Sequence, residues 1–397
     1  MPYQTGRNIA VNYKLEATYG VKPGPTGGLV FRPNSGTMTL AKEPITSNEI
    51  RPDGMSSRGR HGARSVTGNY VGDMSVGTFD PLIEAVFRGT FSAPLALTQA
   101  TMSTATVTVQ ANTITASAGS WITAGLRVGD VIRLGAGFVA GNMNRNVRIT
   151  GLTATVITVA EALTVQSTAA TTWAISRPKT LVQGMTHRSF TFEEYEVDID
   201  GSEVFTGVRV GSIQLQMQPN GMATLGFNLV GQNMEVLEGA AAPYYTNPVK
   251  TTSIGLTAVE AKILVGGVDV LDVSALDMTL NVNASGVPVV GSVVTPDVFT
   301  NLATVNLSLT ALKKDVLRSQ QYLNETDLSL HLVFEDRSSP VPEFVSFYIP
   351  NLTLATTSKG ELGQDNARTQ TFTALVGIDE RGGAFDKTMV KFQTSAV

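Results

Sequence analysis

The sequence predicts a mainly β fold: a β-sandwich with one short flanking helix and a small inserted all-β domain. Charged residues make up only 16% of the 397 residues, and Thr, Val, Ala and Gly are abundant, a composition that favours strands and turns over helices. Many short segments alternate apolar and polar side chains, as strands with one buried face do. Turn signals such as Pro219-Asn220-Gly221 separate these segments.

Residues 1–93 predict strands, one long loop and one helix. Ser35–Ala41 and Arg64–Met74 alternate like strands. Between them, Ser47–Ala63 has no hydrophobic period and carries four Arg or His side chains, and a loop of this length inside a compact domain is usually functional. Asp80 is placed to cap a helix that ends at Gly89. Because this helix is too short to be stable alone, it must dock on a sheet.

Residues 94–180 predict a small β-domain inserted into the first. This stretch is rich in Thr and Ala, is nearly free of acidic residues and holds both tryptophans of the chain. Its evenly spaced strands are typical of a small β-domain. The strands are predicted over Thr104–Val109, Asn112–Ala116, Asp130–Leu134, Asn146–Thr150 and Val156–Val159. We therefore expect residues 1–93 and 181–397 to form one discontinuous β-domain around the insert.

Residues 181–397 predict further strands and a short helix over Asp315–Tyr322, capped by Asp315. The strands are predicted over Ser189–Asp200, Phe205–Gly207, Val210–Met217, Ala223–Val230, Ile263–Val270, Leu276–Val282, Ala303–Leu309, Leu328–Glu335, Glu343–Ile349, Asn351–Ala355 and Arg368–Ile378. A tight turn is expected at Asn283-Ala284-Ser285-Gly286. Two similar strand–hairpin–strand halves indicate a duplicated β-sandwich, although the two halves share little sequence.

The composition excludes several classes of function. Without cysteine the chain has no disulfide, Cys-ligated zinc, iron–sulfur cluster or thiol nucleophile, and three scattered His leave little for metal sites or His-based catalysis. No apolar run reaches the length of a membrane helix and no signal peptide is evident, which predicts a soluble, unexported chain. The net charge of -4 divides into +3 for residues 1–93, +4 for 94–180 and -11 for 181–397.

The acidic run from Glu193 to Glu203 is the strongest candidate for catalysis. Paired carboxylates could serve a glycosidase or a two-metal nuclease. Strand alternation instead places Tyr195, Val197 and Ile199 on one face. It places Glu194, Glu196, Asp198 and Asp200 on the other. This pattern favours a strand with one solvated face over an active site.

The other motifs lack parts of the sites that they resemble. Residues 198–203 (DIDGSE) lack two ligands of a calcium loop. Residues 135–141 (GAGFVAG) have the wrong glycine spacing for a dinucleotide site, and no helix follows them. No P-loop, HExxH or GxSxG motif occurs. We therefore predict no enzyme activity and no catalytic, cofactor-binding or metal-binding residue.

The arginines of the long loop permit two interpretations. They could contact nucleic-acid phosphates, but they are dispersed and only Tyr70 adds an aromatic side chain nearby. They could equally dock on an acidic surface, and the C-terminal half of the same chain is acidic. A contact between unlike faces of identical copies builds rings or filaments. A plain solvated loop remains the third interpretation.

The order of several motifs resembles the major tail tube proteins of long-tailed, non-contractile (siphovirus-type) bacteriophages. The motifs are LEATYG (Leu15–Gly20), SNEIRPDG (Ser47–Gly54), SVTGNYVGDMSVGTFDPLIEAVFRG (Ser65–Gly89), the stretch from SFTFEE to FTGVRVGSIQLQM (Ser189–Met217) and the closing IPNLTLATTSKGELGQDNARTQTFTALVGID (Ile349–Asp379). The resemblance covers roughly residues 1–93 and 182–397. Residues 94–180 resemble the variable domain that some members insert, which would decorate the outside of the tube.

The resemblance implies a barrel-forming sheet and a structural role in the virion. Sheets of six chains would join in a ring, and rings assembled in the host cytoplasm would stack into a tube through which DNA passes during infection without specific binding. The implied partners are further copies, the tape measure protein, the tail terminator and the distal tail protein. Because the chain is long for one sandwich, a doubled sandwich with three chains per ring is the alternative. A ring of six chains is preferred, because only one segment of the chain carries the N-terminal arm, the long loop and the short helix together.

Two sets of site residues follow as hypotheses. The N-terminal arm and the long loop would contact adjacent subunits or the next ring. The contact residues expected on the loop are Glu49, Ile50, Arg51, Arg58, Arg60 and Arg64. The lumen should repel DNA phosphates. The expected lumen-lining residues are Glu194, Glu196, Asp198 and Asp200.

Two other classes of protein remain open. A β-sandwich adhesin or receptor-binding module of a phage or cell surface is the principal alternative, although such proteins usually present clustered aromatics and here aromatics are 7% and dispersed. A carbohydrate-active enzyme is the weaker one. Deleting residues 94–180 should leave assembly possible, whereas deleting Ser47–Ala63 should abolish stacking.

Overall fold

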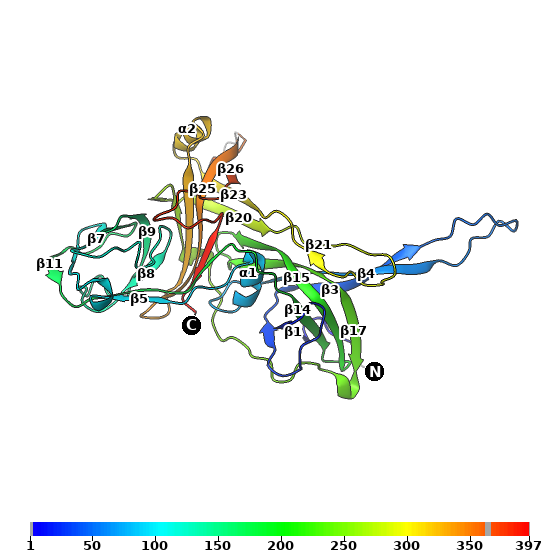
Figure 1. Ribbon diagram of the computed structural model, residues 1–397. Coiled ribbons are helices and arrows are strands. Elements are labelled where there is room, and N and C mark those ends of the chain that lie inside the picture. Colours follow the sequence, from blue (N-terminus) through cyan, green and yellow to red (C-terminus); the bar gives the residue numbers. More distant parts are fainter. Residues whose placement is uncertain (1–2, 362–366, 397) are drawn as a thin grey trace.

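The computed structural model describes residues 3–361 and 367–396 (Figure 1). The described chain is mainly β with two α-helices, which confirms the predicted fold class. Seventeen strands form one hydrogen-bonded network, eight strands form a separate sheet and two form a small ladder. Figure 1 shows the eight-stranded sheet at one side of the molecule and a long two-stranded ribbon projecting from the opposite side.

An N-terminal sandwich is built from residues 3–93 and 180–238. Its strands are β1 (Ile9–Leu15), β2 (Leu29–Phe31), β3 (Ser35–Ile45), β4 (Arg60–Asp73), β14 (Phe190–Glu196), β15 (Gly201–Met217), β16 (Thr224–Gly231) and β17 (Asn233–Glu238). The short strand β13 (Thr180–Val182) lies in the same stretch of chain but pairs with β27 (Lys391–Thr394) of the C-terminal sandwich. One sheet has the order β2-β1-β14-β15-β17, and the other has the order β3-β4-β16-β15. The long strand β15 belongs to both, and a register shift between Val210 and Ser212 marks a bulge of the kind that bends a strand.

Aromatic side chains fill the space between these two sheets. The ring of Phe31 lies 5.3 Å from that of Tyr70, 5.1 Å from Phe79 and 6.0 Å from Phe227, measured between centroids. Helix α1 (Asp80–Phe87) packs against this core. Its buried side chains are Leu82, Ile83, Ala85, Val86 and Phe87. The predicted short helix is therefore present, and it docks on the sheet as its length requires.

A C-terminal sandwich, residues 261–396, repeats this order of elements. Its strands are β18 (Ala261–Val265), β19 (Val268–Asp269), β20 (Val273–Asn281), β23 (Thr304–Leu312), β24 (Leu328–Asp336), β25 (Glu343–Lys359), β26 (Thr369–Val376) and β27 (Lys391–Thr394). One sheet has the order β19-β18-β24-β25-β27, and the other has the order β20-β23-β26-β25. Helix α2 (Leu317–Leu323) follows β23 as α1 follows β4. The small ladder of β21 (Ser285–Gly286) and β22 (Val298–Phe299) lies in the loop between β20 and β23.

The two sandwiches correspond strand by strand, down to their irregularities. Strands β15 and β25 have the same length, and each has a bulge toward the next strand at the equivalent place, Val210/Ser212 in β15 and Leu354/Thr356 in β25. From each bulge, the paired residues can be followed across the sheet, from β15 through β16 and β4 to β3, and from β25 through β26 and β23 to β20. This places Thr37–Leu40 of β3 at the positions that Asp277–Leu280 occupy in β20. The matched segments read TMTL and DMTL. A shared topology, shared bulges and this identity indicate an internal duplication.

The duplicated sheets join edge to edge. Strand β15 pairs antiparallel with β20, from Ser212 opposite Asn281 to Met217 opposite Leu276. Eight strands thereby form one continuous sheet in the order β3-β4-β16-β15-β20-β23-β26-β25. We call this the long sheet. Its two outermost strands are β3 and the C-terminal part of β25.

The segment between α1 and β13 forms its own sheet around its own core. The strands are β5 (Leu95–Thr98), β6 (Val107–Val109), β7 (Thr113–Ala116), β8 (Val131–Leu134), β9 (Asn146–Leu152), β10 (Val156–Val159), β11 (Gln166–Ala170) and β12 (Ala174–Arg177). Trp121 and Trp173 pack edge to face inside it, with ring centroids 5.5 Å apart. Its two ends meet, because Ser92 N donates to Thr180 O at 2.8 Å. An inserted domain at residues 94–180 remains a prediction, which this arrangement suits.

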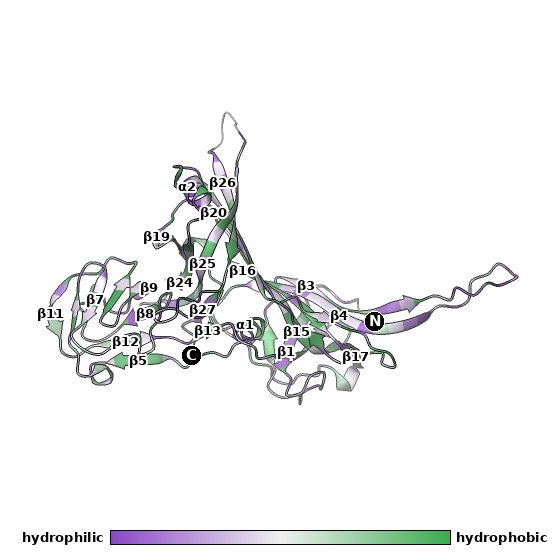
Figure 2. Ribbon diagram, turned by 45° about the horizontal axis from the view of Figure 1, so that its top comes forward, coloured by the Kyte–Doolittle hydropathy of each residue, from purple (hydrophilic) through white to green (hydrophobic). Residues whose placement is uncertain are grey.

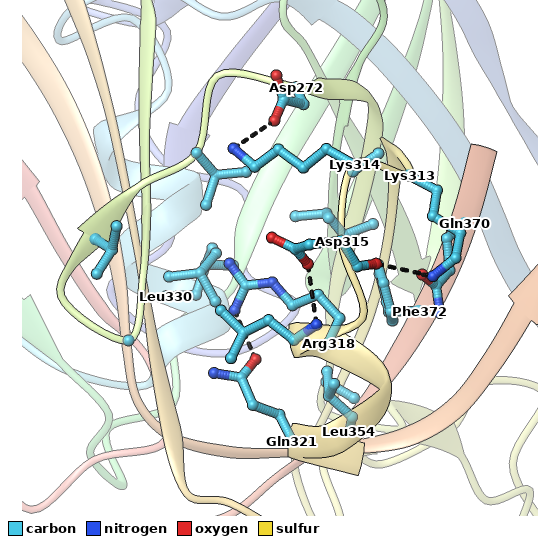
Figure 3. A pocket seen from close by; sticks show the side chains of 18 of the residues that line it. Asp272, Lys313, Lys314, Asp315, Arg318, Gln321, Leu330, Leu354, Gln370 and Phe372 are labelled. Carbon is cyan, nitrogen blue, oxygen red and sulfur yellow. Dashed lines mark hydrogen bonds and ion pairs between the residues drawn. The ribbon is translucent and has the colours of Figure 1, made fainter. Parts of the chain in front are cut away.

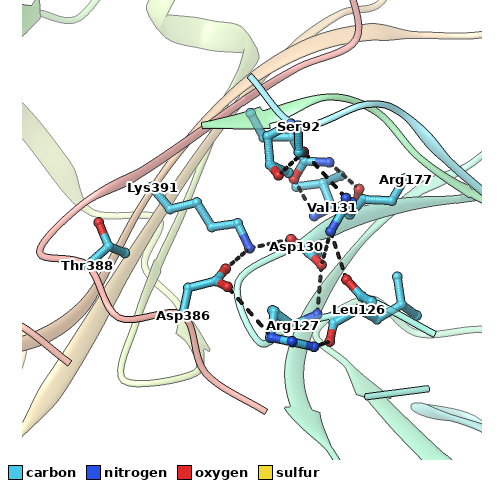
Figure 4. Close-up of polar contacts among 12 residues, drawn as sticks. Ser92, Leu126, Arg127, Asp130, Val131, Arg177, Asp386, Thr388 and Lys391 are labelled. Carbon is cyan, nitrogen blue, oxygen red and sulfur yellow. Dashed lines mark hydrogen bonds and ion pairs between the residues drawn. The ribbon is translucent and has the colours of Figure 1, made fainter. Parts of the chain in front are cut away.

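A buried ionic cluster holds this segment against the C-terminal sandwich (Figure 4). Asp130, directly before β8, is fully buried and forms an ion pair with Lys391 of β27. Lys391 also contacts Asp386 at 2.5 Å, and Arg127 lies 3.7 Å from the same carboxylate. Beside the cluster, the Gln393 side chain accepts from Val131 N at 2.8 Å and donates to Val131 O at 2.7 Å.

Several predicted boundaries were wrong. The strand expected over Ser189–Asp200 ends at Glu196, because the chain turns there into β15. Two strands were expected within residues 205–217, but these residues all belong to β15. Two were likewise expected within residues 343–355, which all belong to β25. Phe79 occupies the N-cap of α1, not Asp80, and Val316 that of α2, not Asp315. The tight turn expected at 283–286 is instead the start of a loop that continues to residue 303.

Candidate assembly surfaces

The first candidate surface is the ribbon formed by the distal parts of β3 and β4. The strands stay paired out to Ile45 opposite Arg60, and residues 46–59 form the tip. Figure 2 shows mostly hydrophilic colouring along the ribbon, which extends far beyond the body of the N-terminal sandwich. The predicted irregular loop Ser47–Ala63 is thus part of a projecting hairpin. Its apolar side chains have nothing to cover them in the described chain: Ile50 is 97% exposed and Met55 68%.

The predicted contact residues do not form one cluster. Arg51 is paired with Asp53 at 2.6 Å, and Ser57 donates to Glu49 at 2.7 Å, so polar contacts within the tip hold its shape. Ile50 lies at the tip, and Arg58 and Arg60 are exposed near it on the returning strand. Arg64 lies at the base of the ribbon, half-buried, where its side chain donates to Asn233 at 3.0 Å. A role for all six in contacts between subunits remains a prediction.

The loop that corresponds to the ribbon in the C-terminal sandwich is docked on the N-terminal sandwich. Ribbon residues 42–64 and loop residues 282–303 occupy equivalent places between paired strands. In the loop, Asp297 forms an ion pair with Arg209 at 2.8 Å, Thr295 O accepts from Gln232 at 2.7 Å, and Val293 O accepts from Arg64 N at 2.7 Å. One of two equivalent hairpins therefore finds its partner surface inside the chain, whereas the other projects outward.

The second candidate surface is the acidic turn between β14 and β15, where the predicted faces of the strand were wrong. Glu194 is not on a solvated face: it is only 9% exposed, and its carboxylate accepts hydrogen bonds from the Tyr70 hydroxyl and from Met38 N. Burial raises the pKa of Glu194, and these hydrogen bonds oppose that shift. Glu193 is fully buried and accepts from Ser202 at 2.8 Å. Both carboxylates therefore support the fold locally.

The other three predicted carboxylates lie at the turn itself. Asp198 accepts from the backbone and hydroxyl of Thr5 and from the side chain of Asn8 at 2.5–2.8 Å, and these bonds lower its pKa. It thereby anchors the N-terminal arm of its own chain. Asp200 accepts from Tyr195 at 3.0 Å and is exposed, and Glu196 is half-exposed. Their lumen-lining role remains a prediction, and its burial makes Glu194 the least suited of the four.

The third candidate surface is one face of the long sheet, which sequence reasoning missed. In each strand, side chains that point into the sandwich alternate with small polar side chains that point away. The outward set includes Thr37, Thr39, Thr67, Asn69, Asn228, Ser212, Gln214, Gln216, Asp277, Thr279, Asn281, Asn306, Ser308, Thr310, Thr371, Thr373, Thr356 and Ser358. One of these residues is acidic and none is basic. The same face also carries Val71, Asp73 and the exposed Leu375. The signal was present as alternation in SGTMTL and NLSLT, but only the strand pairing assembles it into a surface.

The fourth candidate surface is the pair of free edges of the long sheet. In the described residues, β3 pairs with β4 and has no strand on its other side. The C-terminal part of β25 likewise pairs only with β26. Unpaired edges of this kind are open to pairing with another chain. At one point the β3 edge is closed, because Met38 N donates to Glu194.

The C-terminal sandwich also contains a cavity of about 310 Å³ between α2, β23, β25 and β26 (Figure 3). Phe372, Leu354 and Leu309 contribute to its apolar wall. At its mouth Lys314 pairs with Asp272 at 2.8 Å. In the N-terminal sandwich the equivalent region is closed by the aromatic core and by α1, whereas α2 buries none of its residues. The second sandwich is thus the more open copy.

These features define a structural building block. Its open strand edges and projecting ribbon suit repeated contact with like units. The chain belongs to the phage tail tube protein family, whose family model matches residues 6–374. The role is accordingly structural and non-enzymatic, in the tail of the virion. No curated protein matches the chain. In the described residues no group of three or more Asp, Glu or His side chains could hold a metal ion. No described helix is long and apolar enough to cross a membrane.

Proposed function

We propose that copies of the chain join through the edges of the long sheet into closed rings, and that the rings stack into a tube that conducts DNA. The observation that carries this proposal is the long sheet itself. It already joins two sandwiches edge to edge, and it offers one more free edge at each end. Repeating the same junction between chains extends the sheet in a constant direction, as a ring requires.

The duplication supports three chains per ring. The resemblance implies six sandwich units around the lumen, and each chain supplies two of them. The preference for six chains assumed that only one segment carries an arm, a loop and a helix, but β20, loop 282–303, β23 and α2 form a second loop-and-helix set. We therefore favour the alternative of three chains.

In the proposed ring, the polar face of the long sheet lines the lumen. Threonine, serine, asparagine and glutamine side chains present hydrogen-bonding groups without positive charge, so DNA phosphates gain no ion pairs there and can slide. The acidic turn then lies at the end of the other sheet. The ribbon contacts the adjacent ring, and the inserted segment lies outside. Tape measure, terminator and distal tail proteins would be the further partners, and the host cytoplasm the place of assembly.

Electron microscopy of the concentrated protein tests this proposal. We expect rings or tubes with a central hole for the intact chain, and native mass spectrometry of rings should count three chains. Replacing residues 46–59 by a two-residue glycine turn should leave rings but abolish stacking, because Ile45 and Arg60 already face each other and β3 is preserved. Persistent monomers of the intact chain at high concentration would contradict the tube proposal and favour an adhesin-like module.

A further inference from the structure

The junction inside the chain predicts the register of the junction between chains. Strand β15 meets β20 with Ser212 opposite Asn281, Ile213 opposite Leu280 and Gln214 opposite Thr279. The free edge of β25 is the equivalent of the β15 edge, since the bulges at Val210/Ser212 and Leu354/Thr356 coincide. The free edge of β3 is the equivalent of the β20 edge.

Transferring the pairing from one junction to the other fixes three pairs. Ser212 corresponds to Thr356, and Asn281 corresponds to Ala41, through the chain of ladders that links the two sandwiches. We propose that β25 of one copy pairs antiparallel with β3 of the next. The pairs are Thr356 with Ala41, Thr357 with Leu40 and Ser358 with Thr39. This inference rests on the proposed function and goes further, because it names the residues that close the ring.

The side chains suit this register. Met38 and Leu40 point toward the sandwich, as Met278 and Leu280 do at the internal junction, where both are buried. Leu40 is only half-buried in the single chain, so a neighbour opposite it would complete its burial. On the other face, Thr39 and Ser358 are both exposed and would continue the polar surface.

Backbone hydrogen bonding also limits the junction. The N–H of Met38 points to the free edge and is held by Glu194. Alternate residues of a strand point their N–H groups to the same side, so the N–H of Leu40 is the next one directed at the neighbour. Thr357 and Leu40 then form a hydrogen-bonded pair. Thr39 and Ser358 form the adjacent non-hydrogen-bonded pair, in which side chains lie closest.

The chain contains no cysteine, so a pair of introduced cysteines reports this register directly. Under assembly conditions and mild oxidation, we expect T39C/S358C to form disulfide-linked chains of two and three copies, with loss of the monomer band on a non-reducing gel. T39C/T356C is the matched control. Its partners would be diagonal neighbours, too far apart for a disulfide without backbone movement. Mixing the single variants T39C and S358C should give dimers and nothing larger.

The outcomes separate this inference from the proposal on which it rests. Rings of the intact chain with cross-linking in T39C/T356C and none in T39C/S358C would overturn the register and leave the ring standing. Failure of the intact chain to form rings would remove both. If the double variant does not fold, hydrogen exchange on the intact chain decides. Assembly should slow exchange at Leu40 and Thr357, and unchanged exchange there in assembled rings would overturn the inference.

Discussion

At the scale of single residues, burial decides which charges are structural. Asp130 and Lys391 are both almost fully buried and pair with each other across two sheets. Asp130 has one further, more distant cation, Arg177 at 3.7 Å, and Lys391 has Asp386 as a second anion at 2.5 Å. Removing one partner of such a pair leaves an unpaired charge in a poorly solvated place. Exposed pairs such as Lys387 with Glu380 keep their hydration and contribute little.

Lys391→Met should therefore lower the free energy of unfolding by about 3–5 kcal/mol. Lys387→Met, on a neighbouring but exposed pair, should change it by no more than about 1 kcal/mol. Guanidinium denaturation of unassembled protein measures both. Because the loss comes from Asp130, which would keep only the more distant Arg177, the double variant D130L/K391M should recover much of it. A loss for K391M no larger than that for K387M would show that the cluster does not hold the inserted segment.

Glu194 predicts a specific dependence of stability on pH. Burial raises its pKa in the folded chain above the ordinary value that a glutamate has in the unfolded chain. The folded state then binds the proton more tightly. Stability is therefore highest below the unfolded pKa and falls as pH rises from there through the folded pKa. Glu194→Gln removes this fall, and its amide oxygen can still accept from Tyr70 and Met38.

Denaturation midpoints at a series of pH values from about 4 to 7 measure this effect. The difference in stability between E194Q and the unsubstituted chain should shift in favour of E194Q as pH rises. A difference between E194Q and the unsubstituted chain that stays constant across the series would contradict a raised pKa at Glu194.

At the scale of elements, alternation in the sequence predicted most strands but not their ends or their partners. Helix α1 was predicted because Asp80 and Pro81 are helix-start signals, Gly89 is a helix-stop signal, and the residues between them form one apolar stripe. The end of β14 at Glu196 was missed because Val197 and Ile199 continue the alternation while the chain is already turning, and both are about half exposed. Local pattern does not record where a chain reverses.

The duplication illustrates the same limit. Only a few matched positions keep identical residues, such as Met38-Thr39-Leu40 with Met278-Thr279-Leu280, and Phe227 with Phe372. The two sandwiches are recognised as equivalent by their bulge positions and their order of strand pairing, which only the three-dimensional backbone shows. The candidate lumen surface was missed for this reason: its residues come from eight strands spread along the chain. The carboxylates first predicted to line the lumen lie close together in the sequence, at every second position from Glu194 to Asp200, and Glu194 is buried.

At the scale of the whole molecule, assembly and decoration occupy different parts of the chain. The long sheet carries both free edges, and the ribbon projects from its β3 end. The segment from β5 to β12 attaches at the far side, through the ionic cluster and through hydrogen bonds from Arg133 and Asn146 to Pro342 O (Figure 1). None of these contacts involves β3 or residues 356–359 of β25. Loss of this segment should therefore leave the proposed ring junction intact.

Deleting residues 93–179 and joining Ser92 to Thr180 through one or two glycines tests this separation. The two joined residues already lie within hydrogen-bond distance, at 2.8 Å from N to O, so the join imposes no new loop. We expect rings and stacked tubes of reduced outer diameter in electron micrographs, with the central hole unchanged. The deletion exposes Lys391, which then becomes a solvated surface charge still facing Asp386. A shortened chain that folds, as judged by circular dichroism, but forms no ring would place part of the ring contact in the inserted segment and remove it from the outside of the tube.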